Sequence, residues 1–79
     1  MILIKMASNR QLKLKLQVVS FNMHGFNQGS QAINEIVDNF NPDIFLLQEH
    51  WLTEANLNKF NIFSDYFSFG CSAMNDKVA

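Results

Sequence analysis

Polar residues that could bind a metal ion follow two hydrophobic segments of this sequence. Asn22 follows the first segment, and Gln48, Glu49 and His50 follow the second. If both segments are parallel strands, their carboxyl ends meet at one sheet edge, where open α/β sheets bind ligands. Mg²⁺ prefers oxygen ligands and often takes only one or two carboxylates plus water and phosphate. Asn22 and Glu49 could therefore begin a Mg²⁺ site that acts on a phosphoryl group. The spacing alone favours a simpler interpretation, in which Asn22 and Glu49 are ordinary polar residues at the ends of two strands and bind no metal.

The hydrophobic pattern predicts the elements that would position these residues. Residues 12–18 alternate between apolar and polar, and the apolar residues continue to Phe21, so a strand should end near Asn22. A loop rich in Gly and Asn follows, and Ser30 is the predicted N-cap of a helix. The helix presents one apolar stripe, made of Ile33, Ile36, Val37 and Phe40.

The segment after the predicted helix completes a βαβ unit. Asn41-Pro42 should end the helix, because a residue before proline is displaced from helical geometry. The apolar run in residues 43–49 predicts a strand buried on both faces. The two strands should then be parallel, with a right-handed crossover. A short helix capped by Thr53 and an aromatic-rich strand over residues 63–69 are expected next.

Composition suggests a piece of a larger α/β domain. The chain has 79 residues, of which 48% are hydrophobic and 16% charged, with eight Phe and one Cys. So short a chain encloses only a small core, and a single cysteine allows no internal disulfide. Residues 1–11 show no clear period and are expected to be a leader or a disordered N-terminus, whereas residues 12–79 should form the domain fragment.

Charge and hydropathy give mostly negative expectations. The formal net charge is −1, which gives no bulk sign of binding to nucleic acid or to an anionic membrane. The longest strictly apolar runs are four residues, too short for a membrane span or a signal peptide. We therefore expect an intracellular protein that does not bind a membrane.

Two motifs at this spacing resemble the opening of the endonuclease/exonuclease/phosphatase family. Ser20-Phe-Asn-Met-His-Gly25 is similar to the S-x-N-x-x-G that ends a strand in that family, and Pro42-Asp-Ile-Phe-Leu-Leu-Gln-Glu49 to its P-D-I-x-x-L-Q-E. The continuation His50-Trp-Leu52 looks most like the apurinic-type endonuclease domain of non-LTR (LINE-like) retrotransposons. Those domains nick target DNA to prime reverse transcription. The resemblance covers roughly residues 16–69.

The resemblance implies a fold, a metal and a substrate. The family fold is a four-layer α/β sandwich, of which this chain would supply the N-terminal part, namely the βαβ unit with the following helix and strand. Glu49 matches the metal-binding glutamate, Asn22 the asparagine that lines the metal and phosphate site, and Gln48 a supporting position. The implied cofactor is Mg²⁺, or Mn²⁺ in its place, and the implied partner is DNA, in the nucleus or cytoplasm.

The family's later motifs would follow residue 79. They are a catalytic Tyr, an Asp-x-Asn pair and a closing Ser-Asp-His with the general-base histidine. Tyr66 does not lie in the family's tyrosine context. We therefore expect this chain to hold part of a metal site, to need the missing C-terminal half of the domain, and to be inactive by itself.

Other candidate residues have plainer interpretations. His24 and His50 could be a zinc pair with Glu49, but they lack metal-site spacing, so solvent-facing loop histidines are expected. Trp51 could stack on a base, although beside a buried strand it is predicted to pack. Cys71 is expected to be an inert thiol. The Phe cluster over residues 60–69 should be core, or an interface with the missing half.

Two alternatives to the endonuclease hypothesis stay open. One is a phosphoesterase of the same fold that acts on a small or lipid phosphate, because those branches share Asn22 and Glu49. The other is a non-catalytic remnant. The coding sequence downstream would separate them: intact Asp-x-Asn and Ser-Asp-His motifs favour an enzyme, a stop codon favours a remnant, and a reverse-transcriptase region favours a retrotransposon.

Overall fold

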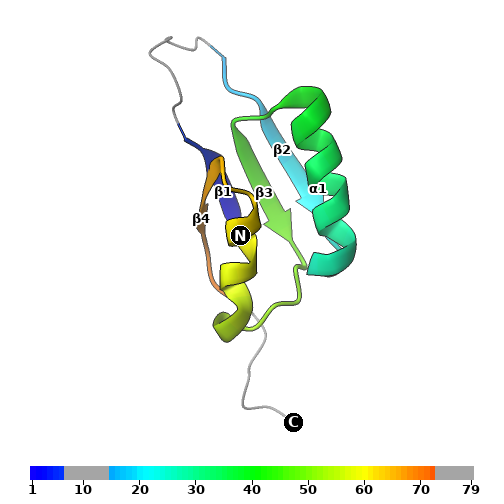
Figure 1. The fold of residues 1–79 in the computed structure, drawn as a ribbon, viewed down its shortest axis with the longest axis vertical. Coiled ribbons are helices and arrows are strands. Elements are labelled where there is room, and N and C mark those ends of the chain that lie inside the picture. The colour runs from blue at the N-terminus through cyan, green and yellow to red at the C-terminus, as the bar shows by residue number, and fades with distance from the viewer. Residues whose placement is uncertain (7–14, 73–79) are drawn as a thin grey trace.

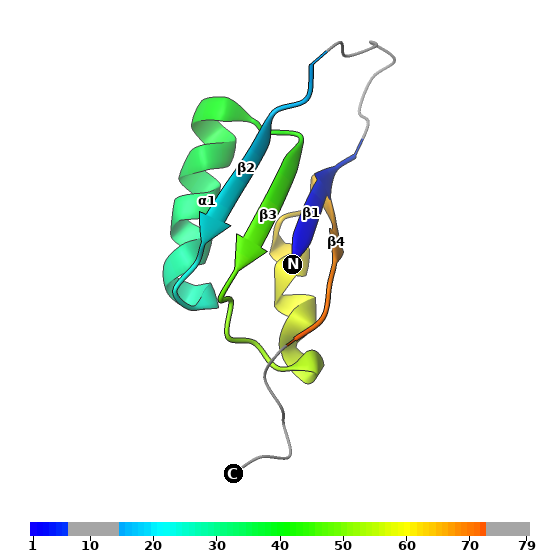
Figure 2. The ribbon, with the colours of Figure 1, turned by 180° about the vertical axis from the view of Figure 1, so that it is seen from behind.

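A four-stranded mixed sheet with two helices forms the described part of the chain. The computed structural model describes residues 1–6 and 15–72. The strands are β1 (Ile2–Lys5), β2 (Val18–Asn22), β3 (Ile44–Gln48) and β4 (Tyr66–Phe69). The α-helix α1 (Phe26–Phe40) joins β2 to β3, and the 3₁₀ helix η1 (Glu54–Ile62) lies between β3 and β4. Figures 1 and 2 show both helices on the same face of the sheet.

The predicted βαβ unit is confirmed. The strand order is β2-β3-β1-β4, and β2 and β3 are parallel, whereas β1 is antiparallel to both β3 and β4. Parallel register pairs Val18 with Ile44 and Asn22 with Gln48. Both strands therefore end at the same edge of the sheet. The helix α1 ends just before Asn41-Pro42, as the sequence predicted, and Asn41 adopts a left-handed conformation.

The expected leader over residues 1–11 is wrong for its first residues, because β1 is an interior strand of the sheet. Leu3 is fully buried, and its neighbours Ile2 and Ile4 pair with β3 and β4. Residues 7–11 lie outside the described residues. A four-residue strand is too short to show a period, and its partners lie more than 35 residues away in the chain, so the local sequence gave no sign of it.

The predicted starts of the first strand and of the helix in the βαβ unit differ from those in the structure. The strand predicted from residue 12 begins at Val18; Lys15 to Gln17 are not strand, and residues 12–14 lie outside the described residues. Ser30 is not an N-cap: α1 begins at Phe26, and the Ser30 hydroxyl donates to the Asn27 carbonyl inside the helix. The early start buries Phe26, whose ring contacts that of Phe60 edge-on at a centroid distance of 4.9 Å.

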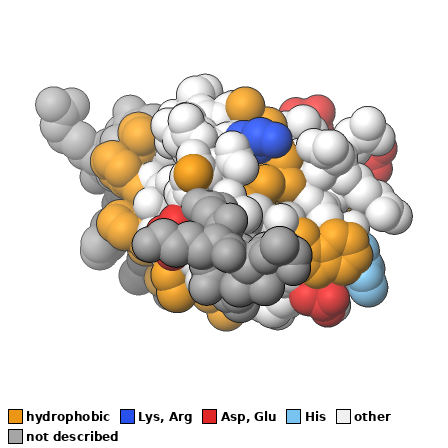
Figure 3. Space-filling model, turned by 90° about the horizontal axis from the view of Figure 1, so that it is seen from below, with side chains coloured by type: hydrophobic (Ala, Val, Ile, Leu, Met, Phe, Trp, Pro, Cys, Tyr) orange, Lys and Arg blue, Asp and Glu red, His pale blue; other side chains and the backbone are white. Residues whose placement is uncertain are grey.

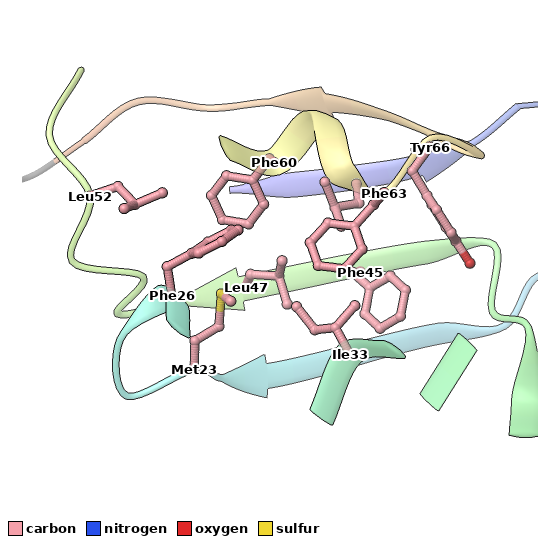
Figure 4. Packing of buried hydrophobic residues seen from close by; sticks show 10 residues of the cluster. Met23, Phe26, Ile33, Phe45, Leu47, Leu52, Phe60, Phe63 and Tyr66 are labelled. Atoms are coloured by element: carbon pink, nitrogen blue, oxygen red, sulfur yellow. The ribbon is translucent and has the colours of Figure 1, made fainter. Parts of the chain in front are cut away.

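The hydrophobic core lies between the sheet and the two helices (Figure 4). Phe45 and Leu47 of β3 point into it, and α1 contributes Phe26 and Ile33. Phe60 of η1 is almost completely buried, as expected for a core member of the Phe cluster. Burial of these large side chains is the main stabilising contribution available to so small a domain. The remaining buried members are Leu3, Met23, Leu52, Phe63 and Tyr66.

The other face of the sheet is uncovered and apolar. We predicted β3 to be buried on both faces, but its residues alternate between buried and exposed, and Leu46 is 37% exposed. The Phe cluster is divided in the same way, since Phe63 lies in the core whereas Phe67 and Phe69 are exposed. No helix in residues 1–6 and 15–72 is long and apolar enough to cross a membrane. Exposed apolar residues of the uncovered face come from all four strands: Ile2, Ile4, Val18, Leu46, Phe67 and Phe69.

Candidate functional site

Asn22 and Glu49 contact each other at the shared carboxyl edge of β2 and β3. The Asn22 Nδ2 group donates a hydrogen bond to Glu49 Oε2. The Asn22 Oδ1 atom accepts a hydrogen bond of 3.1 Å from the backbone N–H of His24. Both ends of the amide are therefore engaged, which fixes its orientation toward the carboxylate. The predicted proximity of the two residues is confirmed, and their role in metal binding stays a prediction.

Backbone hydrogen bonds hold the two loops of this edge together beyond the ends of the strands. The N–H of Met23 donates to the Gln48 carbonyl at 2.8 Å, and the N–H of Gly25 donates to the Glu49 carbonyl at 2.8 Å. These bonds extend the pairing of β2 and β3 by several residues. The side chains of Asn22 and Glu49 thus project from hydrogen-bonded backbone, although both are exposed to solvent.

Left-handed backbone conformations gather at this edge. The described residues contain four non-glycine residues with positive φ, and three of them are here: His24 (50°), Glu49 (54°) and Trp51 (59°). Such a conformation is costly for an L-residue and is over-represented at functional sites. Its concentration around one contact favours a site over an ordinary pair of strand ends.

Two glycines allow the close packing of this edge. Gly25 has a φ of 96°, and a Cβ atom built on it would lie 3.0 Å from Cε3 of Trp51. A Cβ atom on Gly29 would lie 2.5 Å from the Cβ atom of Met23, the residue directly after Asn22. The first turn of α1 therefore rests directly on the loop that carries the site. Both glycines lie in the segment that the sequence predicted to be a loop. In the structure, Gly25 packs against the indole of Trp51, and Gly29 packs against the backbone of Met23.

The prediction that Trp51 packs is wrong for most of its surface. Trp51 is 54% exposed, although its six-membered ring contacts Gly25. The chain turns sharply after β3 through the left-handed Glu49, so Trp51 does not continue the buried alternation of the strand. Figure 3 shows this end of the molecule, where histidine, acidic and hydrophobic side chains are exposed near one another.

His50 is a buried residue rather than the solvent-facing histidine that we expected. Its Nδ1 atom accepts a 3.0 Å hydrogen bond from the backbone N–H of Leu52, and its ring contacts that of Phe60 edge-on. Burial lowers the pKa of His50, and a hydrogen bond with the backbone of Cys71 partly opposes this effect. His24 is exposed, as predicted. His50 thus packs in the core and supports the loop after β3.

The remaining candidates have structural contacts. Gln48 Nε2 donates to the Leu46 carbonyl at 3.0 Å and to Ser20 Oγ at 3.4 Å, on the uncovered face of the sheet. Tyr66 is buried and donates its hydroxyl to the Pro42 carbonyl, which agrees with leaving it outside the site. Cys71 is exposed and free. Gln48 therefore joins the two strands that carry the site.

One residue of the motif has a role that sequence reasoning missed. Asp43 is buried, and its Oδ2 atom accepts a 2.9 Å hydrogen bond from the backbone N–H of Gln17. The backbone N–H of Asp43 donates in turn to the Gln17 carbonyl. The Pro-Asp-Ile sequence thus ties the start of β3 to the start of β2. A short polar residue directly before a buried strand was the available signal.

The residues at this edge fit a divalent cation in part. Glu49 provides a carboxylate for the cation, and the hydrogen bond from Asn22 goes to Oε2 rather than to Oε1. Asn22 acts as a donor to the carboxylate, and its Oδ1 atom, which accepts one hydrogen bond from His24, has a second lone pair that could bind a metal ion. No group of three or more His, Cys, Asp or Glu side chains placed to hold a metal occurs in the part of the chain that the structure describes. A single carboxylate completed by water and phosphate oxygens is a known arrangement for Mg²⁺.

Comparison of the chain with protein-family models, with curated proteins and with solved structures found no match.

Proposed function

We propose that this chain is part of a Mg²⁺-dependent phosphodiesterase domain that nicks DNA, of the kind found in non-LTR retrotransposons. The observation that carries the proposal is the contact between Asn22 and Glu49 at the shared carboxyl edge of two parallel strands. Strained backbone around that contact supports it. The two motifs that contain these residues resemble the metal-site motifs of the endonuclease/exonuclease/phosphatase family.

In this proposal the chain is the N-terminal part of a four-layer α/β sandwich. Support comes from the uncovered face of the sheet, where Leu46, Phe67 and Phe69 are exposed beside apolar residues of β1 and β2. Exposed apolar surface of this kind marks an interface. A second sheet packed about 10 Å away would bury it. The remaining elements of the domain, with the later catalytic motifs, would supply that sheet.

Each residue of the site has a separate task. The Glu49 carboxylate would hold Mg²⁺, which neutralises charge on the phosphate and on the leaving oxygen when it is bound. Asn22 orients that carboxylate through its Nδ2 group and is itself fixed by the backbone of His24. Gly25 holds the loop after β3 through its bond to the Glu49 carbonyl. Proton transfer from the nucleophile would fall to the histidine of the later motifs.

The test is nicking of supercoiled plasmid by the chain extended through the proposed later motifs. Glu49→Gln keeps the size of the side chain and removes its charge. Loss of one electrostatic contributor of this kind typically lowers a rate by about 10²–10³. We expect that loss, together with a higher Mg²⁺ requirement and unchanged DNA binding in the absence of metal. Glu35→Gln, which removes an exposed carboxylate of α1, is the matched control and should nick normally.

The same variants separate the substrate classes. A domain that ignores plasmid DNA but releases phosphate from a small phosphate ester or a phosphoinositide, with the same dependence on Glu49, would be a phosphoesterase. An extended chain that does neither would be a remnant. Nicking at the unmodified rate by Glu49→Gln would contradict the proposed role of Glu49.

A further inference from the structure

Trp51 is an exposed aromatic residue beside the candidate site. A Cβ atom built on Gly25 would lie 3.0 Å from Cε3 and 3.2 Å from Cζ3 of the ring, so the six-membered ring rests on that glycine. Gly25 in turn donates its N–H to the Glu49 carbonyl. The indole therefore lies directly against the loop that carries the contact between Asn22 and Glu49. With 54% of the residue exposed, a broad part of its surface stays accessible.

This arrangement does not favour folding. A left-handed conformation costs a bulky L-residue roughly 1–2 kcal/mol, and Trp51 adopts it with a φ of 59°. An exposed indole also gains little from the hydrophobic effect. Strained backbone of this kind clusters at ligand-binding sites, which indicates that the Trp51 side chain binds a ligand.

The charge of the site limits what that ligand can be. The two segments that form the edge, residues 22–25 and 48–51, contain no Lys or Arg, and the whole chain has a formal net charge of −1. Attraction to phosphate by basic side chains is therefore not available from these segments. An aromatic platform provides affinity for nucleic acid without positive charge, because every base has a π face that can stack.

We infer that Trp51 is a stacking platform for an unpaired nucleobase of the nucleotide next to the phosphodiester. The inference rests on the proposed function, since it assigns the substrate of the same edge. The packing of the six-membered ring against Gly25 restricts the positions that the indole can take before the base arrives. A side chain that is already restricted loses less conformational entropy on binding, which favours affinity. The site would thus prefer single-stranded, frayed or flipped nucleotides over a fully paired duplex.

The sequence offers a direct probe of this stacking, because Trp51 is the one tryptophan of the 79-residue chain. Its fluorescence is measured during titration with short single-stranded oligothymidylate, with EDTA present to remove divalent metal. An abasic oligonucleotide of the same length carries the same phosphates without bases. We expect quenching by oligothymidylate and none by the abasic strand. Equal quenching by both strands, or quenching by neither, would overturn the inference.

Variants test the same point by anisotropy of a dye-labelled oligothymidylate. Trp51→Ala should weaken binding about 5- to 150-fold, the range for loss of one stacked base, and Trp51→Tyr should restore most of it. Phe40→Ala removes another exposed aromatic side chain, at the far end of α1, and should bind as the unmodified chain does. Circular dichroism verifies that each variant is folded. Binding by folded Trp51→Ala that equals the unmodified chain would refute the platform.

Failure of the two proposals can be distinguished. The stacking titration contains no divalent metal, so Glu49→Gln should leave the quenching intact. If nicking does not depend on Mg²⁺ or on Glu49 while the quenching is intact, only the phosphodiesterase proposal is refuted. Intact metal binding without base-dependent quenching would remove the platform alone.

Discussion

Gly29→Ala tests whether the first turn of α1 really rests on the loop of the candidate site. Alanine is normally the better helix residue, by about 1 kcal/mol. Here its Cβ atom would lie 2.5 Å from Cβ, 2.9 Å from Cα and 2.9 Å from the carbonyl oxygen of Met23. Two of these atoms are backbone, so the clash cannot be relieved by a side-chain rotation alone.

The expected size follows from these opposing effects. Overpacking costs typically about 1–3 kcal/mol, and contacts with backbone place this site near the upper end. After the gain in helix propensity, the free energy of unfolding should fall by about 2 kcal/mol. For a chain of this size that loss lowers the melting temperature by roughly 8–16 °C. The helix must also move away from Met23, which shifts the neighbouring contact between Asn22 and Glu49.

Urea unfolding followed by circular dichroism gives the free energy, and NMR of the Asn22 side-chain amide reports the contact. Ser30→Ala on the same helix is the matched control. If Ser30 were the N-cap, as its sequence context suggested, its loss would cost about 1 kcal/mol. Because its hydroxyl bonds to Asn27 inside the helix, we expect almost no loss. A Gly29→Ala variant more stable than the unmodified chain would refute the packing described here.

Two other predictions follow, one from the burial of His50 and one from the exposure of Phe67. Since burial holds the pKa of His50 below its ordinary value of 6.5, the unfolded chain binds the proton more readily; stability should therefore fall as the pH drops below about 6.5. Urea midpoints across that range should show this loss in the unmodified chain and in His24→Gln but not in His50→Gln, and an identical pH dependence in His50→Gln would contradict it. Phe67→Lys on the uncovered face should lower both binding of a hydrophobic dye and self-association. Sedimentation and dye fluorescence check this, with Phe40→Lys as the control. If Phe67→Lys lowers neither dye binding nor self-association, the uncovered face is not the surface responsible for them.

Local periodicity was sufficient to predict the elements that position the site. The end of α1 at Asn41-Pro42 and most of its apolar stripe depend on neighbours within one or two turns. Phe40 is the exception, since it was predicted to belong to the stripe but is 66% exposed at the end of the helix. Parallel strands on either side of such a helix must end at the same edge, so the approach of Asn22 to Glu49 could be predicted as well.

Features that depend on distant partners could not be predicted. β1 is defined by pairing with β3 and β4, far along the chain, and not by any pattern within its four residues. The start of α1 depends on burial of Phe26 against Phe60. The burial of His50 and the exposure of Trp51 both follow from the turn after β3, which no local period describes.

Metal binding at the Asn22–Glu49 edge is the central claim, and Mn²⁺ tests it on the 79-residue chain itself. Bound Mn²⁺ broadens NMR signals of nearby nuclei, so the Asn22 side-chain amide and the backbone of Gly25 should broaden first. Signals of Phe40, at the other end of α1, should stay sharp. Mg²⁺ should compete and restore the signals, and Glu49→Gln should abolish the selective broadening whereas Glu35→Gln should not. Broadening that is uniform over the chain, or that is unchanged in Glu49→Gln, would contradict a metal site at this edge.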